Sequence, residues 1–322
     1  MSRRAALAGA MLAGAALALP RMARAQWPER PLRFVVAFPP GASTDVLMRA
    51  VAAVLAERLG RPCVVENRPG AGGNLATQHV MATAPDGYGL LVHSTAFVVN
   101  PGLFRNAGYD PVRDFAPVAM LADTPNVLFV NRDVPARTLT DLLALMRARP
   151  GMAYASSGTG TTPHLGAELL FRRLAGVEAT HVAFGPAQAV TAVVAGQAPI
   201  GSTSLPPALP LIVEGAVRGI ALAGARRDPR LPDLPTVAEQ GFAGFEASTW
   251  FAVLAPARTP PAIADRLHDE IEAALATPAL RERLAAMAFS ATPRPRATMV
   301  AQITAEATKW AEVVRLSGAV AE

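Results

Sequence analysis

The stretch Phe34–Asp45 carries side chains and backbone groups suited to binding an anion. Its sequence, FVVAFPPGASTD, is an apolar run that ends at two prolines and a glycine, followed by small hydroxyl residues. Phe34–Phe38 is typical of a buried strand, and Ser43, Thr44 and Asp45 are residue types that begin helices. The free N–H groups of such a helix would face whatever lies above the strand end. The alternative is a turn that is capped by its own side chains and binds nothing.

A second loop of the same kind lies at Ser156–His164, with the sequence SSGTGTTPH. Pro163 suits the first turn of a helix, which makes Thr162 the expected N-cap. The hydroxyl and glycine residues that could donate hydrogen bonds to an anion are Ser157, Gly158, Thr159, Gly160 and Thr161. A capped turn without a ligand is again the alternative. If the two loops faced each other across a cleft, they could hold one carboxylate between them.

Sequence motifs for catalysis are absent. The chain has no HExxH, no nucleophile elbow and no phosphate-binding P-loop. His164 and Glu168 are four residues apart on an expected helix and could share a metal, but a structural role is the stronger interpretation. A hydrolase that uses Ser157 with His164 is a further hypothesis with little support. We therefore expect no catalytic residue, no metal and no cofactor.

Strand and helix patterns alternate from Phe34 onward, which predicts an α/β fold with parallel strands covered by helices. The expected strands are 33–38, 63–66, 89–93, 115–122, 126–130, 153–156, 181–184, 199–204, 219–222 and 249–255. The expected helices are 45–59, 73–83, 138–148, 163–175, 187–195, 261–276, 278–288 and 299–317. The stretch 94–114 is expected to be irregular. Thr138 is the expected cap of its helix, with Asp141 in the first turn.

The first 25 residues have the pattern of a cleavable export signal. Arg3 and Arg4 precede a short apolar segment, and Ala23–Ala25 matches a cleavage site. The arginine pair fits a twin-arginine signal and plain secretory export equally well. Removing the four arginines of this segment lowers the formal net charge of +5 by four, to +1, which disfavours a nucleic-acid partner. Cys63 is the only cysteine, so no disulfide can form within the chain, and we expect it to be buried.

The length of 322 residues allows two domains, and no segment after the signal is apolar enough to span a membrane. Seven motifs occur in order along the chain. They are FVVAFPPGASTD at Phe34–Asp45, VVENRPGAGG at Val64–Gly73, PDGYGLL at Pro85–Leu91, YDPVRDFAPV at Tyr109–Val118, YASSGTGTTPHLGAELL at Tyr154–Leu170, LPDLPTVAEQGF at Leu231–Phe242 and WFAVLAP at Trp250–Pro256. From about Trp27 to the C-terminus, the chain resembles the Bug-type substrate-binding proteins of tripartite tricarboxylate transporters.

The resemblance implies a periplasmic binding protein-like fold. Two doubly wound α/β domains would be joined by two crossing segments, with a central cleft between them. Domain 1 would comprise residues 26–124 plus 248–322, and domain 2 would comprise residues 125–247. The implied function is that of a monomeric periplasmic receptor, which binds a small organic acid and delivers it to the membrane subunits of a transporter. A ligand-binding subunit of a sensory system is the alternative.

The resemblance also implies which residues touch the ligand. On its motif positions lie Phe38, Gly41, Ala42, Ser43, Thr44, Asp45, Ser157, Gly158, Thr161 and His164. Ser94 and Thr95 follow an expected strand, Ser204 ends another, and all three could also line the cleft. Asp45 is expected to orient the first loop. The chain departs from the family at Ala42, where a second glycine is usual, and at 184–186, where FGP replaces a loop that contains a lysine. The second departure favours an uncharged or apolar distal group over a tricarboxylate.

Overall fold

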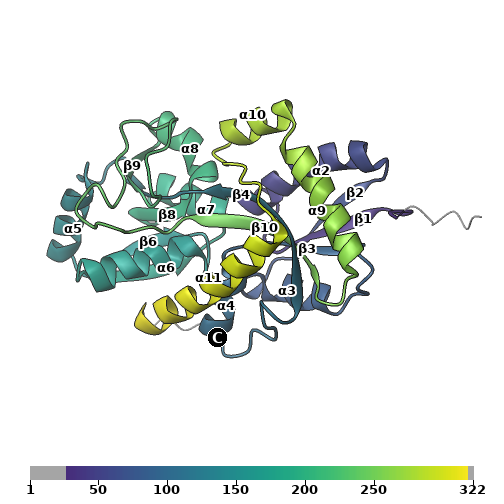
Figure 1. Cartoon of the computed structure of the whole chain (residues 1–322). Coiled ribbons are helices and arrows are strands. Elements are labelled where there is room, and N and C mark those ends of the chain that lie inside the picture. The colour runs from purple at the N-terminus through teal and green to yellow at the C-terminus, as the bar shows by residue number, and fades with distance from the viewer. Residues whose placement is uncertain (1–26, 318–322) are drawn as a thin grey trace, which may run out of the picture.

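A computed structural model describes residues 27–317, which form two five-stranded mixed sheets flanked by helices (Figure 1). The first sheet has the order β2-β1-β3-β10-β4 and contains β1 (Leu32–Val36), β2 (Cys63–Asn67), β3 (Gly89–Ser94), β4 (Phe115–Thr124) and β10 (Thr249–Pro256). The second has the order β7-β6-β8-β5-β9 and contains β5 (Asn126–Asn131), β6 (Met152–Ser156), β7 (Ala179–Ala183), β8 (Ile200–Ser204) and β9 (Val217–Leu222). The expected export signal, residues 1–25, lies outside the described residues.

The two sheets have the same arrangement of strands. In the first, β1 pairs in parallel with β2 and β3, and β10 runs antiparallel to β3 and β4. In the second, β6 pairs in parallel with β7 and β8, and β5 runs antiparallel to β8 and β9. This architecture confirms the α/β, periplasmic binding protein-like fold class.

Helices lie on both sides of the sheets. The first sheet is accompanied by α2 (Ser43–Leu59), α3 (Asn74–Met81), α4 (Ala96–Leu103), α9 (Pro261–Leu275), α10 (Pro278–Ala286) and α11 (Arg296–Ser317). The second is accompanied by α5 (Leu139–Ala148), α6 (Thr162–Glu168), α7 (Pro186–Val194) and α8 (Leu205–Val213), and a π-helical turn, Leu169–Leu174, extends α6. Because β1 is covered on both faces, Phe34 packs in one hydrophobic cluster and Val35 in another. A strand buried on both faces explains the uninterrupted apolar run.

Two helices were not expected from the sequence because both contain proline. The stretch 94–114, expected to be irregular, contains α4, and Pro101 lies inside it. The hydroxyl of Tyr109 donates to the Phe97 carbonyl at 2.8 Å, the carbonyl that the N–H of residue 101 would otherwise bond. In α8 the first prolines fall in the first turn, where backbone N–H groups have no partner within the helix. Cys63 is half-buried rather than buried, and burial raises the pKa of its thiol to about 12.

The start of α5 has the cap that the sequence predicts. The Thr138 hydroxyl accepts a hydrogen bond from the Asp141 backbone N–H at 3.1 Å, and the Asp141 carboxylate accepts one from the Thr138 N–H at 3.0 Å. We expect Thr138→Ala to lower the free energy of unfolding by about 1 kcal/mol, measured by urea denaturation. Thr140→Ala, an exposed change in the same helical turn, is the control and should cost almost nothing. Equal losses in both variants would contradict the capping role.

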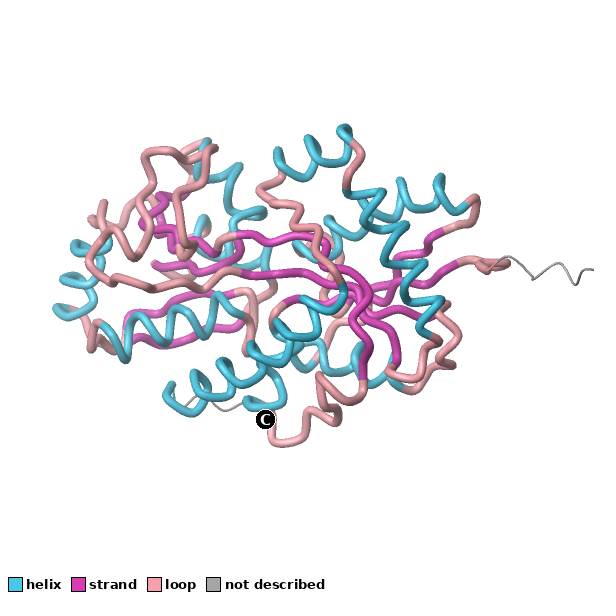
Figure 2. The backbone as a smooth tube through the Cα atoms, in the orientation of Figure 1, coloured by secondary structure: helices cyan, strands magenta, loops and turns pink. Residues whose placement is uncertain are grey.

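The chain crosses between the sheets twice, and the two crossings lie side by side (Figure 2). Thr124 at the end of β4 is the register partner of Thr249 at the start of β10. Asn126, just after the first crossing, donates to the Thr162 hydroxyl at 3.1 Å and accepts from the Thr249 hydroxyl at 2.7 Å. Both crossing segments are therefore tied to the first residue of α6.

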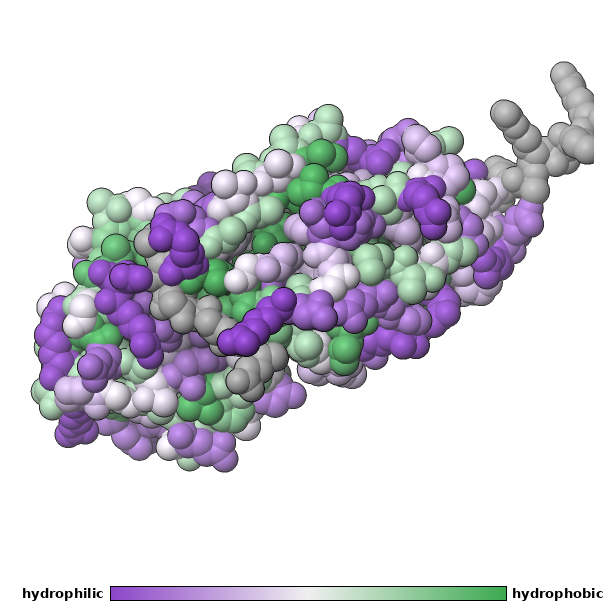
Figure 3. Space-filling view, turned by 90° about the horizontal axis from the view of Figure 1, so that it is seen from below, coloured by the Kyte–Doolittle hydropathy of each residue, from purple (hydrophilic) through white to green (hydrophobic). Residues whose placement is uncertain are grey.

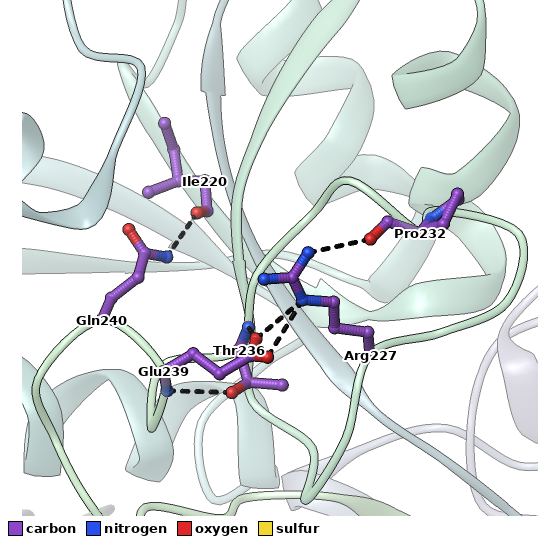
Figure 4. A network of polar contacts seen from close by, with 6 residues as sticks. All are labelled: Ile220, Arg227, Pro232, Thr236, Glu239 and Gln240. Atoms are coloured by element: carbon purple, nitrogen blue, oxygen red, sulfur yellow. Dashed lines mark hydrogen bonds and ion pairs between the residues drawn. The ribbon is translucent and has the colours of Figure 1, made fainter.

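The segment that returns from β9 to the second crossing is fastened by a polar network (Figure 4). Glu239 and Thr236 exchange hydrogen bonds between side chain and backbone, at 2.7 and 3.1 Å. The Arg227 guanidinium donates to both Glu239 carboxylate oxygens and to the Pro232 carbonyl. Gln240 donates to the Ile220 carbonyl in β9 at 2.9 Å. These contacts give the motif at Leu231–Phe242 a structural role.

The face shown in Figure 3 is a mosaic of hydrophilic and hydrophobic residues. The large hydrophobic side chains that are exposed, such as Leu75, Leu174 and Val213, come from separate elements of the chain. Isolated exposed residues of this kind are ordinary on protein surfaces. Within residues 27–317, no helix combines the length and the apolarity that a membrane crossing requires.

Candidate functional site

The structure brings the two loops predicted from the sequence to one place between the sheets. They meet at a small cavity of about 20 Å³, enough for one or two water molecules. Of the predicted residues, those that line it are Phe38, Ser43, Thr44, Ser94, Thr161 and Ser204. Helix α2 starts on one side of the cavity and α6 on the other. Two helix N-termini therefore converge on one point, and each offers backbone N–H groups that suit an anion.

The two halves of the molecule touch directly at this cavity. The Ser43 hydroxyl at the start of α2 lies 2.8 Å from the Ser204 hydroxyl at the end of β8. Both side chains are nearly inaccessible, with relative exposures of 4% and 5%. The two sheets are therefore in direct contact at this point.

The helix caps differ from the expected ones in a way that favours binding. The N-cap of α2 is Ala42 rather than a hydroxyl or acidic residue, and the N-cap of α6 is Thr161 rather than Thr162. Neither residue makes a capping hydrogen bond through its side chain. The N-cap side chains therefore do not cap these helices, although the Asp45 carboxylate and the His164 ring accept hydrogen bonds from the N–H groups of Gly41 and Gly160. The N–H groups of the first turns remain suited to an external acceptor.

The first loop is held in shape by Asp45. Its carboxylate accepts hydrogen bonds from the Gly41 N–H, the Arg49 guanidinium and the Asn67 amide, each at 2.9 Å. Burial alone would raise the pKa of Asp45, but these hydrogen bonds hold it below its usual value. Gly41 has a φ of 79°, which favours glycine, whereas Ala42 has a φ of −66°. The methyl group of Ala42 therefore introduces no backbone strain.

The second loop is supported from inside its own domain. Ser157 shares a hydrogen bond with Thr203 at 2.7 Å, and the Thr161 hydroxyl donates to the Gly158 carbonyl at 2.7 Å. His164 accepts from the Gly160 N–H at 3.3 Å. Ser157 and His164 thus bond to other partners rather than to each other. The arrangement that a hydrolase would need does not form.

A pair of stacked histidines lies under the second loop, with His164 buried and His181 half-buried. The rings of His164 and His181 stack with their centroids 3.9 Å apart. Burial, then the neighbouring His181 and Arg172, lowers the pKa of His164 to about 3, and burial lowers that of His181 to about 4. Glu168 bonds Tyr154 and Arg172, so it does not form a metal pair with His164. Both imidazoles are neutral at pH 7 and contribute no positive charge to the cleft.

Thr95 has a role in the crossing segments. Its N–H donates to the Trp250 carbonyl at 3.1 Å, and its hydroxyl accepts from the Trp250 N–H at 2.9 Å. These bonds tie the end of β3 to β10. Thr249 also lines the small cavity, and sequence reasoning did not select it. The motif WFAVLAP gave no signal for it, because Thr249 precedes Trp250–Pro256.

A larger cavity of about 550 Å³ adjoins the two loops. Its walls include Ser157 and Gly158 from the second loop and the glycine-rich turn 69–73 from the first domain. Phe104 and Phe184 complete the walls from opposite sides of the cleft. The motif VVENRPGAGG marked the turn but gave it no function, and nothing in the sequence pointed to Phe104.

Another hollow, of about 640 Å³, lies on the crossing segments and is lined by Arg226, Arg227, Asp228 and Arg230 among others. Two of its arginines are already neutralised, since Arg227 pairs with Glu239 and Arg230 with Asp228. The site at the two loops is the stronger candidate because it combines helix N-termini with buried hydroxyls from both domains.

Comparisons with known proteins agree with this geometry. The family model described as tripartite tricarboxylate transporter family receptor matches residues 47–318. The protein BugT of Bordetella pertussis is 37% identical over 99% of this chain and 98% of its own length. The structure of Rpa4515 of R. palustris with adipate is 34% identical, with a TM-score of 0.87 over 91% of this chain and 99% of that one.

A second solved structure, that of MatC from Rhodopseudomonas palustris with bound malate, is 33% identical. Its TM-score is 0.83, and the match covers 89% of this chain and all of the other. The family match and these structural similarities cover nearly the whole described chain. The chain belongs to the tripartite tricarboxylate transporter receptor family, the Bug-type solute-binding proteins, and it is a binding protein rather than an enzyme.

Proposed function

We propose that this protein is a periplasmic receptor that binds one small organic acid in the cleft and delivers it to the membrane subunits of a transporter. The observation that carries the proposal is the convergence of α2 and α6 on one buried cavity lined by hydroxyl groups. Two related proteins, Rpa4515 and MatC, have been solved with the carboxylates adipate and malate. The residues in contact with the carboxylate would be Ser43, Thr44, Thr161 and Ser204, with Asp45 bracing the first loop.

The binding needs no arginine. A hydrogen bond to a charged group contributes about 1.5–3 kcal/mol, and a helix N-terminus adds roughly 0.3–1 kcal/mol. If about five such bonds and two helix ends act together, the gross gain is on the order of 8–17 kcal/mol. Association costs about 4–15 kcal/mol, so micromolar affinity, about −8 kcal/mol, is attainable. Exclusion of water from the closed cleft strengthens each of these bonds.

We further propose that residues 26–124 plus 248–322 form one lobe and residues 125–247 the other. The ligand would bind between open lobes and stabilise the closed arrangement. The Ser43–Ser204 contact would form only on closure, because the two residues come from different lobes.

The direct test is a binding screen with the mature protein. Calorimetry and thermal shift should detect at least one mono- or dicarboxylate that binds, and the corresponding primary amide should bind far more weakly. If every carboxylate failed to bind, the proposed function would be wrong. Binding of the amide with equal affinity would show that the carboxylate is not the recognised group.

The variant that tests the site combines Ser43→Ala with Thr161→Ala. Both side chains line the small cavity and are buried, so we expect affinity to fall tenfold or more. Thr191→Ala, an exposed hydroxyl on α7, is the control and should bind normally. Calorimetry measures the affinity, and thermal melting without ligand should change little. A melting loss of many degrees, with affinity preserved, would make these hydroxyls structural.

A further inference from the structure

The two loops of the site are built on one plan. In each sheet, a strand between two parallel neighbours, β1 or β6, leads through a loop into a helix, α2 or α6. A glycine stands directly before the N-cap in both loops, with a φ of 79° at Gly41 and 81° at Gly160. The side chain four residues further on accepts a hydrogen bond from the N–H of that glycine. This side chain is Asp45 in the first loop and His164 in the second.

We propose that His164 is a positioning residue, which holds the second loop in the shape that binds the carboxylate, as Asp45 holds the first. The inference rests on the proposed carboxylate-binding function. It gives His164 a role without contact with the ligand, because the Gly160 N–H occupies its Nδ1 atom. Since Nδ1 is the acceptor, the ring proton of the neutral imidazole belongs on Nε2.

The ring of His164 is itself held in place by His181 on β7, against which it stacks. His181 Nε2 shares a hydrogen bond with the Ser156 hydroxyl at 2.7 Å, and the Ser156 oxygen accepts one from the Gly158 N–H at 3.2 Å. The stacked pair therefore supports the amides of both Gly158 and Gly160. Residues that are locked by neighbours in this way can keep a binding loop within the narrow range of geometry that binding needs.

The acceptors of the two loops differ in charge. The Asp45 carboxylate is compensated by the Arg49 guanidinium at 2.9 Å. The guanidinium that acts on His164 is that of Arg172, which already pairs with the Glu168 carboxylate at 2.7 Å. Because burial keeps its pKa near 3, the His164 imidazole is neutral at pH 7. It therefore holds the second loop without placing a negative charge close to the bound carboxylate.

The test replaces His164 and measures affinity by calorimetry, with malate, adipate and benzoate as probes. His164→Leu keeps a side chain of similar size but removes the acceptor, so affinity should fall at least fivefold. His164→Asn is smaller and leaves a cavity, so it should melt at a lower temperature. Its Oδ1 atom can replace Nδ1 as the acceptor, so affinity should stay within threefold of the unaltered protein. Affinities that follow the melting temperature rather than the acceptor would overturn the inference.

Two further variants test the charge and the specificity of the effect. His164→Asp has the acceptor of the first loop without its arginine, so it should bind more weakly than His164→Asn. Equal or tighter binding would contradict the need for a neutral acceptor. His268→Leu is the matched control, because His268 is a half-buried histidine that bonds the Val118 carbonyl and lines neither cavity of the site. It should bind normally, and a loss as large as that of His164→Leu would overturn the inference.

Hydrogen exchange at the Gly160 amide, followed by NMR, gives a measurement that needs no ligand. We expect slow exchange in the unaltered protein and in His164→Asn, and faster exchange in His164→Leu. Uniform exchange together with normal binding in all variants would overturn this inference and leave the proposed function standing. Failure of every probe to bind the unaltered protein would contradict the proposed function, and this inference with it.

Discussion

Replacing Gly160 with alanine is expected to weaken ligand binding by roughly 5- to 150-fold while the unliganded protein stays folded. Gly160 lies in the second loop, and a Cβ there would come within 2.7 Å of the Leu103 side chain and 2.8 Å of the Asn100 side chain. Both neighbours belong to α4 on the other side of the cleft, and both are buried. Overpacking a closed contact costs about 1–3 kcal/mol, which corresponds to that range in affinity.

The control variant must separate the effect of the blocked contact from the effect of backbone strain. Gly160 has a φ of 81°, a conformation in which alanine is strained. Gly215 has a φ of 74°, and a Cβ at this residue would meet no atom within 4 Å, so Gly215→Ala carries similar strain without the closure contact. We expect Gly215→Ala to cost stability but to bind ligand normally. Calorimetry measures affinity, and small-angle scattering with saturating ligand reports whether the Gly160 variant compacts. Normal affinity and full compaction in Gly160→Ala would show that this contact does not form in the closed state.

The second large effect is a loss of stability in mild acid. Burial lowers the pKa of His93 to about 4, that of His164 to about 3 and that of His181 to about 4. The unfolded chain takes up protons on these residues near pH 6.5, whereas the folded chain does so only near their lowered pKa values. The unfolded state thus binds more protons between pH 6.5 and about 4, so stability is fully present above pH 6.5 and falls as pH falls. Each histidine contributes up to about 1.4 kcal/mol per pH unit.

Two carboxyl groups oppose this trend. Burial raises the pKa of Asp123 and of Glu272, so the folded state takes up these protons before the unfolded state does. The net slope is therefore smaller than the sum of the three histidines. Urea unfolding at pH 7 and pH 5 measures it, and we expect a loss of several kcal/mol.

The contribution of His164 and His181 to the pH dependence of stability can be measured whatever the stability of the variants at pH 7. The double change His164→Gln with His181→Gln should flatten the dependence on pH between 7 and 5, whatever its effect at pH 7. His79→Gln, a change at a less buried residue of α3, is the control and should leave most of the slope in place. A double variant that keeps the full slope would place the titrating groups elsewhere.

The fold class could be predicted because hydrophobic patterns and breaking residues carry most of the information. The run Phe34–Phe38 is apolar at every position because β1 is buried on both faces. Thr138 and Asp141 formed the expected cap because a capping box depends only on residues three apart. Helix α4 was missed because Pro101 removes an N–H, and its compensation comes from Tyr109 in another segment.

The sequence predicts that two loops form the site, but it does not predict which of their atoms meet. Which hydroxyl meets which depends on the packing of the two sheets, so the Ser43–Ser204 contact and the ring of Phe104 had no local signal. The position of His164 had no local signal either. It was expected at the ligand, and its ring is stacked on His181.

By itself, the amino-acid sequence determined the alternation of strands and helices, the two glycine-and-hydroxyl loops and the family. These properties arise from neighbours in the chain, through periodic burial, backbone freedom and hydrogen bonds over three or four residues. Only the tertiary structure decided which loop residues meet, and that no ionisable side chain among residues 27–317 lines the larger cavity. Ser43 and Ser204 are 161 positions apart in the chain, so their contact exists only once both sheets have folded and packed against each other.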